Sequence, residues 1–304
     1  MRNVDGGGRT ETGTFMRIAI IGAGGQLGRE LVALTDPDQT LALTHRNIEI
    51  TEAGSISAAL DGRDVSVVIN AAAYNFVDRA EDEPDVAWVI NSRGPRLIAQ
   101  WCAANNAVCV HVSTDHVFGL DAERTTPYEE TDATGPVSAY GVSKLAGECF
   151  VRATCERHFV VRTCGLYGHP PAGGKGNFVE TMLRLGRGKG EVRVVNDQHC
   201  TPTSAADLAK MILALVRTDA YGLYHATNAG ETTWNGFAKE IFRQSGTIAL
   251  AEPISTAEFD ARARRPAYSV LDCRKLEAVT GLKVRDWREA LAEYLGADGV
   301  SGER

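Results

Sequence analysis

The chain has 304 residues, of which 44% are hydrophobic and 23% are charged, and its formal net charge is −7. This length suits one large domain or two coupled ones, with a core that needs no disulfide or metal support. The mildly acidic charge argues against a nucleic-acid-binding protein, and the lack of an apolar run of roughly 18 residues argues against a membrane-spanning one.

The cysteines and histidines show no pattern typical of a disulfide framework or a metal site. The seven cysteines are an odd number without a C-x-x-C pair, and the seven histidines lack the spacing of metal ligands. This usage favours a reducing compartment. We therefore predict a cytoplasmic protein without a readable metal site.

The first 15 residues differ in composition from the rest of the chain. They include three consecutive glycines, Gly6 to Gly8, and almost no aliphatic side chains. Because they lack an apolar stretch, they do not resemble a signal peptide. We predict that residues 1–15 form a disordered tail and that the folded part begins at Met16.

Short apolar runs alternate with helical patterns in the first half of the chain. The expected strands are residues 17–21, 41–44, 65–70, 108–112 and 159–162, and the expected helices are 26–34, 86–105 and 140–153. This alternation indicates βαβ units, and apolar runs without polar alternation are typical of parallel strands buried on both faces. We predict an α/β fold whose residues 16–165 form a Rossmann-type, doubly wound parallel sheet that binds NAD(P).

The pattern changes after Tyr167. Glycine and proline cluster between residues 168 and 176, and shorter elements follow: helices at 178–185, 205–216, 233–244 and 286–294, and strands at 192–195 and 221–226. We predict that residues 166–304 form mainly a smaller, mixed C-terminal lobe that binds the substrate, with segments that return to the Rossmann domain.

A glycine-rich turn, Gly22-Ala-Gly-Gly-Gln-Leu-Gly28, follows the first expected strand and opens the first helix. Glycines here allow positive φ and a close approach of the backbone to a pyrophosphate, and the helix N-terminus faces the anion. The alternative is a simple glycine-rich turn, but the position directly after the first strand favours a dinucleotide site. We predict that Gly22, Gly25 and Gly28 belong to a cofactor site.

The end of the second expected strand indicates which cofactor is preferred. NAD-specific folds place a carboxylate about 20 residues after the glycine turn, whereas Thr44-His-Arg-Asn47 contains none. Arg46 is suited to pair with a 2′-phosphate, although a solvated surface arginine is the alternative. We predict NADPH as the cofactor, with NADH tolerated.

Tyr140 and Lys144 are spaced to lie on one face of a helix. An ammonium group near the phenol favours phenolate, so we expect the pKa of Tyr140 to lie below its usual value of about 10. Thr114 ends the fourth strand, where sheet enzymes place catalytic groups, and its hydroxyl would bind the reacting oxygen beside Tyr140. The alternative for Thr114 is a strand-end hydroxyl with a purely structural role.

Several phrases of the sequence resemble one known family. They are Asn70-Ala-Ala-Ala73, Ser113-Thr-Asp-His-Val-Phe118, Tyr140-Gly-Val-Ser-Lys144 with Leu-Ala-Gly-Glu148, Arg162-Thr163, Pro202-Thr203 and Arg265-Pro-Ala-Tyr-Ser-Val-Leu-Asp272. Together they resemble the extended short-chain dehydrogenases/reductases and, within these, the dTDP-4-dehydrorhamnose reductase family. The resemblance covers nearly the whole chain from Met16 onward.

This resemblance implies a set of residue roles. Tyr140 would be the proton donor, Lys144 would hold the nicotinamide ribose and tune Tyr140, and Thr114 would contact the keto oxygen. The other implied contacts are Gly25, Gln26 and Leu27 to the cofactor phosphates, Ala71, Ala72 and Ala73 to the adenosine and ribose, and Asp115, Gly165 and Asn177 to the substrate.

The implied reaction is hydride transfer from NADPH to the C4 ketone of a nucleotide-linked 6-deoxy-4-keto sugar, converting dTDP-4-dehydrorhamnose to dTDP-L-rhamnose. The resemblance also implies a homodimer, because some relatives form dimers. Alternative functions are the reduction of another nucleotide-linked 4-keto sugar, or a non-catalytic, dinucleotide-binding regulatory subunit of the methionine adenosyltransferase type.

The chain departs from the family pattern at two positions near the expected site. Gly165 stands where many of these reductases carry a tryptophan that packs on the deoxysugar, and His116 stands where the family often has tyrosine. Since an indole is a large and rigid apolar wall, its absence favours a wider pocket that admits a bulkier sugar. The alternative is that the segment from His169 to Gly176 fills the space.

Overall fold

The computed structural model describes residues 16–169 and 176–298. The predicted tail, residues 1–15, lies outside the described residues, and so does most of the glycine- and proline-rich segment after His169.

The centre of the molecule is a six-stranded sheet in the order β10-β5-β4-β3-β1-β2. Every pair of neighbouring strands is parallel, which confirms the predicted sheet. The strands are β1 (Ile18–Ile21), β2 (Thr40–Leu43), β3 (Val67–Asn70), β4 (Val108–Thr114), β5 (His158–Thr163) and β10 (Gly222–His225). The strand order reverses between β1 and β3, and ligands of open α/β sheets bind at the carboxyl ends of strands beside such a reversal.

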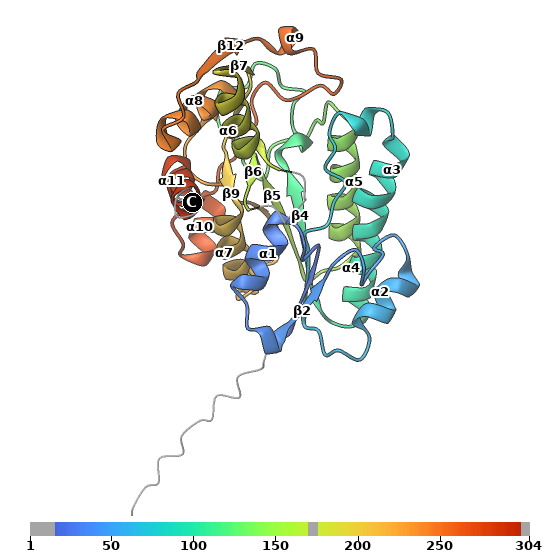
Figure 1. The fold of residues 1–304 in the computed structure, drawn as a ribbon. Helices are drawn as coiled ribbons and strands as arrows, with labels where there is room; N and C mark the ends of the chain where they lie inside the picture. Colours follow the sequence, from blue (N-terminus) through green and yellow to red (C-terminus); the bar gives the residue numbers. More distant parts are fainter. Residues whose placement is uncertain (1–15, 170–175, 299–304) are drawn as a thin grey trace, which may run out of the picture.

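Helices cover both faces of this sheet (Figure 1). One face packs on α1 (Gln26–Ala33), α7 (Ala205–Leu215) and α10 (Arg274–Thr280), and the other on α2 (Ala53–Leu60), α4 (Gly94–Ala104) and α5 (Ala139–Thr154). In β1, Ile18 and Ile20 belong to the first core, whereas Ala19 and Ile21 belong to the second. This is why the strand is an unbroken apolar run.

The helix predicted over residues 86–105 contains an irregularity. It begins as α3 (Pro84–Trp88), widens into the π-helical segment η3 (Val89–Arg93) and continues as α4. Within η3, the buried Asn91 amide donates to the Tyr74 carbonyl at 3.0 Å and to the Ser143 hydroxyl at 3.0 Å, and its oxygen accepts from the Tyr74 N–H at 2.8 Å. Asn91 thereby ties α5 to the loop that follows β3.

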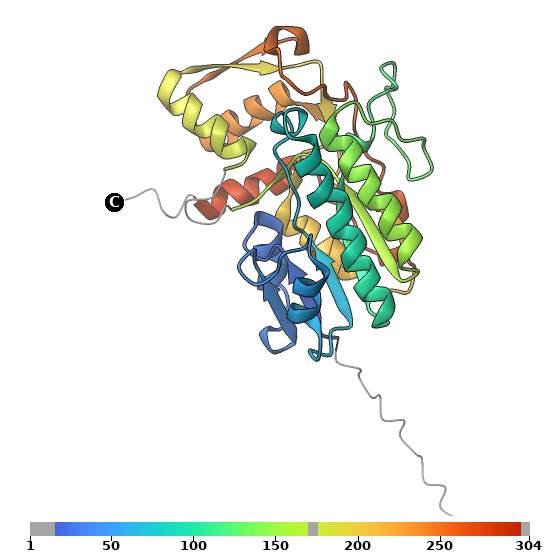
Figure 2. The same ribbon diagram turned by 90° about the vertical axis from the view of Figure 1, so that its right-hand side faces the viewer.

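A smaller lobe lies at one end of the sheet (Figure 2). Its core contains Tyr167, Val179, Phe237 and Trp287. The helices are α6 (Phe178–Lys189), α8 (Trp234–Ser245), α9 (Thr256–Phe259) and α11 (Trp287–Asp298), and the paired strands are β7 (Glu191–Val195) with β12 (Leu250–Ile254), β6 (Leu166–Tyr167) with β9 (Thr203–Ser204), and β8 (His199–Cys200) with β11 (Thr232–Thr233). Strand β10 and helices α7 and α10 come from this half of the sequence but pack in the central sheet and its layers.

Within the described ranges, 16–169 and 176–298, no helix has the length and apolar character needed to cross a membrane.

Candidate active site

The start of α5 is seated directly on the turn that follows β4. Ser138 caps the helix by accepting a hydrogen bond from the Gly141 N–H at 3.2 Å. A Cβ atom on Gly141 would lie only 2.3 Å from the His116 carbonyl oxygen, so only glycine allows this contact. The missing side chain therefore lets Tyr140, the preceding residue, reach the end of β4.

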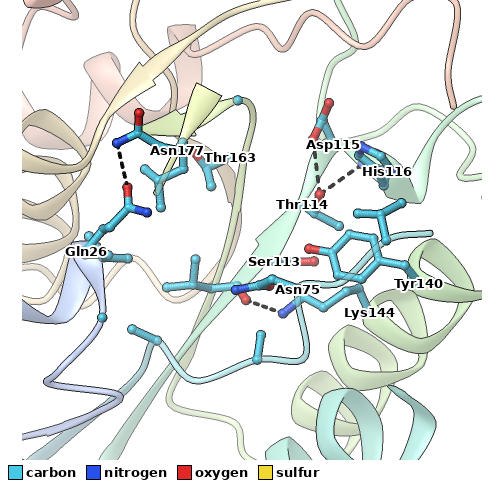
Figure 3. Close-up of a pocket in the computed structure, with 18 of the residues that line it drawn as sticks. Gln26, Asn75, Ser113, Thr114, Asp115, His116, Tyr140, Lys144, Thr163 and Asn177 are labelled. Atoms are coloured by element: carbon cyan, nitrogen blue, oxygen red, sulfur yellow. Dashed lines mark hydrogen bonds between the residues drawn. The ribbon is translucent and has the colours of Figure 1, made fainter. Parts of the chain in front are cut away.

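Thr114 ends β4 with its hydroxyl near the Tyr140 phenol (Figure 3). Its Oγ accepts from the His116 N–H at 3.2 Å and donates to the Asp115 carboxylate at 3.1 Å. The His116 ring meets the Tyr140 ring edge-on, with centroids 5.5 Å apart. Two hydroxyl groups are thus brought together at the carboxyl edge of the sheet, as the sequence predicts.

The structure corrects the expectation that Lys144 lowers the pKa of Tyr140. Burial raises the pKa of Tyr140 above its usual value, and only a hydrogen-bonding interaction with Thr114 acts in the opposite direction. The Lys144 ammonium donates to the Val112 carbonyl at 2.6 Å, and burial lowers the pKa of Lys144 to about 8. The helical spacing correctly predicted that Tyr140 and Lys144 lie at one site. Desolvation, however, determines whether the Tyr140 phenol is charged.

A cavity of about 600 Å³ joins these groups to the glycine turn and to the C-terminal lobe. The predicted site residues that line it are Gly25, Gln26, Leu27, Gly28, Ala71, Ala73, Thr114, Asp115, Tyr140, Lys144, Gly165 and Asn177. The predicted residues absent from its lining are Gly22, Ala72 and Arg46.

The positions of these three residues explain why they do not line the cavity. Gly22 has a φ of +84°, and a Cβ atom on it would lie 2.8 Å from the Ala72 nitrogen, so these two residues pack on each other behind the turn. Arg46 is exposed beyond the end of β2, the strand beside β1. A side chain there fits contact with an outer part of a dinucleotide rather than with the reacting group.

The N-terminus of α1 fits the pyrophosphate of a dinucleotide. Its N-cap is Gly25, which has no side chain to satisfy the N–H groups of the first turn. Gln26, Leu27 and Gly28 of that turn line the cavity. Free N–H groups at a helix N-terminus that opens into a cavity form an anion site.

On the lobe side, Asn177 connects the two halves of the molecule. Its oxygen caps α6 by accepting from the Glu180 N–H at 3.1 Å, and its amide donates to the Gly168 carbonyl at 2.7 Å and to the Gln26 side chain at 3.5 Å. The amide is thus engaged within the protein, which favours a role in holding the pocket wall.

Gly165 lines the cavity with a backbone that disfavours any side chain. Its φ is +54°, and a Cβ atom there would lie 3.2 Å from the Pro202 Cα atom. Of the segment that the alternative interpretation assigns to this space, His169 to Gly176, residues 170–175 lie outside the described residues. Trp234, at the start of α8, supplies an aromatic wall to the same cavity and packs on Phe178 at a centroid distance of 4.8 Å.

Sequence reasoning did not assign several of the lining residues to the site. They are Asn75, Val77, Val112, Ser113, His116, Thr163, Leu166, Gly176, Trp234 and Arg265. Ser113 and His116 flank motif residues, so their proximity was readable from the sequence. Arg265 opens one of the family-like phrases, so the sequence marked it as well, whereas Trp234 comes from a distant segment and carried no local signal.

Comparisons with known proteins agree with this geometry. Residues 16–299 match the model of the RmlD substrate binding domain. The chain is 42% identical to dTDP-4-dehydrorhamnose reductase of Streptomyces griseus, with 92% of this chain and 93% of the relative covered. It is 40% identical to a probable dTDP-4,6-dihydroxy-2-methyloxan-3-one 4-ketoreductase of Streptomyces antibioticus, over 91% of this chain and 94% of the relative.

Among solved structures, dTDP-4-dehydrorhamnose reductase of Bacillus anthracis strain Ames in complex with NADP is similar, with a TM-score of 0.88 and 37% identity over 93% of this chain and 99% of that one. The family model spans the Rossmann domain and the lobe alike, so the assignment concerns the whole architecture. This chain belongs to the RmlD substrate binding domain family of extended short-chain dehydrogenases/reductases.

Proposed function

We propose that this chain reduces the C4 ketone of dTDP-4-dehydrorhamnose with NADPH and forms dTDP-L-rhamnose. The observation that carries the proposal is the meeting of Thr114, Tyr140 and Lys144 with the N-terminus of α1 in one cavity. The names of its relatives and the NADP-bound structure of one of them support the same substrate and cofactor.

The chain's own residues would divide the work as follows. NADPH supplies the hydride when bound, and the protein supplies orientation and a proton. Because burial raises the pKa of Tyr140, the phenol is protonated at neutral pH and can donate its proton to the ketone oxygen. Thr114 would hydrogen-bond that oxygen, and Lys144 would hold the nicotinamide ribose.

Substrate contacts are proposed for Asp115, Gly165 and Asn177, and cofactor contacts for the glycine turn, Ala71 to Ala73 and Arg46. NADPH is the expected cofactor, with NADH tolerated. The lobe, residues 166–304, would bind the nucleotide sugar, and residues 16–165 would bind the cofactor. A homodimer in the cytoplasm completes the proposal, and light scattering of the purified protein tests the dimer.

A second candidate function is the reduction of another nucleotide-linked 4-keto sugar. Gly165 favours it because that part of the cavity wall carries no side chain. The relative from Streptomyces antibioticus is named for a different keto sugar at a similar identity, which supports this reading.

The experiment is to follow NADPH oxidation by absorbance with dTDP-4-dehydrorhamnose and with a panel of other nucleotide-linked 4-keto sugars. The highest kcat/KM on dTDP-4-dehydrorhamnose is the expected result, and a clear preference for another sugar would favour the second candidate. NADPH binding without turnover of any sugar would support the non-catalytic alternative.

A further inference from the structure

A buried ion pair contacts Ser113, the residue directly before Thr114. The side chains of Glu148 on α5 and Arg162 on β5 are 0% and 2% exposed. Arg162 Nη2 donates to Glu148 Oε2 at 2.7 Å, and its Nε donates to Oε1 at 2.9 Å. The Ser113 hydroxyl donates to the same Oε1 at 2.5 Å. Removing both charges of such a bidentate pair from water costs free energy, so a pair at this position is expected to have a specific role.

Glu148 links α5 to the last residues of β4. It follows Lys144 by one helical turn, so the two side chains share a face of α5. Lys144 Nζ donates to the Val112 carbonyl at 2.6 Å, and the next residue of β4, Ser113, donates to Glu148. The strand is therefore held to the helix at two consecutive residues directly before Thr114.

The same carboxylate opposes the effect of burial on Lys144. Burial lowers the pKa of Lys144 to about 8, and the negative charge of Glu148 raises it. Other titratable or charged groups lie on the elements that meet here: His111 on β4, whose pKa the Lys144 charge affects, Tyr140 on α5 and Asp115 after β4, which affect one another, and Arg162 on β5, which pairs with Glu148. Burial and the Lys144 charge lower the pKa of His111, so this ring is neutral at neutral pH.

We propose that Glu148 is a positioning residue whose carboxylate fixes the end of β4 and keeps the Lys144 ammonium group charged where it meets the nicotinamide ribose. The inference rests on the proposed function, because the ribose contact of Lys144 belongs to that proposal. Lys144 carries its charge below its pKa and loses it above. Cofactor affinity should therefore fall as the pH rises through that value.

The test is the dissociation constant of NADPH, measured by fluorescence titration across the pH range in wild type and in Glu148→Gln. In the wild type we expect the affinity to weaken with a midpoint near pH 8, the pKa of Lys144. In the variant we expect this midpoint to move down by about one pH unit, because a carboxylate one helical turn away acts on that scale in a desolvated site.

Two further variants separate this effect from general damage. Glu148→Gln combined with Arg162→Met removes both buried charges, so no unpaired charge destabilises the fold. Because the two charges act on the pKa of Lys144 in opposite directions, we expect a downward shift that is smaller than in Glu148→Gln alone. Asp207→Asn breaks another ion pair, to Arg285 at 2.6 Å, on a side chain that is 8% exposed and outside the cavity lining. This control should leave the midpoint where it is.

The outcomes are distinct. An unchanged midpoint in Glu148→Gln, a larger shift in the double variant than in Glu148→Gln, or an equal shift in Asp207→Asn would each overturn this inference and leave the proposed function standing. A wild type that does not bind NADPH at any pH would overturn both.

Discussion

The two halves of the cavity are built in different ways. On the Rossmann side, the expected ligand contacts come from the ends of sheet strands and the first turns of helices: the first turn of α1, the residues after β3, the end of β4 and the start of α5. On the lobe side they come from side chains on separate elements, such as Trp234 and Arg265. The comparison teaches that the cofactor side follows from the regular ends of strands and helices, whereas we expect substrate choice to depend on a few side chains from separate segments.

The largest expected effect concerns Tyr140, which we place where the two halves of the cavity meet. Tyr140→Phe should lower kcat by about 10²–10⁴-fold, because it removes the proposed acid, and should leave NADPH binding close to wild type. Steady-state kinetics and fluorescence titration measure the two quantities. Tyr128→Phe is the control, since its buried hydroxyl has no hydrogen-bond partner among the described residues. A Tyr140→Phe enzyme with nearly normal kcat would refute the assignment.

Trp234→Ala tests the lobe side alone. Loss of the aromatic wall should raise the KM for the nucleotide sugar by about 5- to 30-fold, equivalent to about 1–2 kcal/mol of apolar contact, with the NADPH dissociation constant unchanged. Trp101→Ala is the matched control. Trp101 lies on α4, where its indole N–H donates a hydrogen bond to the Asp61 carboxylate at 2.7 Å, and it does not line the cavity. If NADPH binding weakened as much as sugar binding, the two sides would not be separable.

Arg46→Ala tests the Rossmann side alone. The KM for NADPH should rise about tenfold while the KM for NADH stays the same, because a charge-assisted bond to the 2′-phosphate is lost. Arg63→Ala, which removes another exposed arginine, controls for the change in net charge. Equal effects of Arg46→Ala on both cofactors would show that this residue does not recognise the 2′-phosphate.

The smallest expected effect concerns neither half. A chain that begins at Met16 should keep the melting temperature and the kcat of the full chain, because residues 1–15 contain few side chains able to join a core. Differential scanning calorimetry and the NADPH assay compare the two proteins. A clear fall in melting temperature would mean that this segment docks on the fold.

The sequence predicted the Rossmann side well because its signals are local. Apolar runs marked β1, β3, β4 and β5, and the glycine turn and the Tyr140–Lys144 spacing marked the site. Helices α2 and α10 escaped notice because few of their side chains are buried. In α2 only Ile56 and Leu60 are buried, and α10 buries Leu276 alone, so neither shows a clear helical period.

Two features of the site could not be read from the sequence. Trp234 reaches the cavity only because α8 packs on α6 through Phe178 and Phe237, a contact between distant segments. The direction in which the pKa of Tyr140 shifts depends on burial, which the spacing of two residues does not reveal. Local patterns therefore predicted which residues meet, but not the solvent environment in which they meet.

The left-handed backbone at Gly165 has a consequence for how this pocket could change during evolution. A tryptophan at position 165 would need both a different backbone conformation and space now taken by Pro202. The single substitution Gly165→Trp would therefore strain the backbone at this position. We therefore expect a bulky side chain at this position to require accompanying changes in the segment packed against it, which includes Pro202.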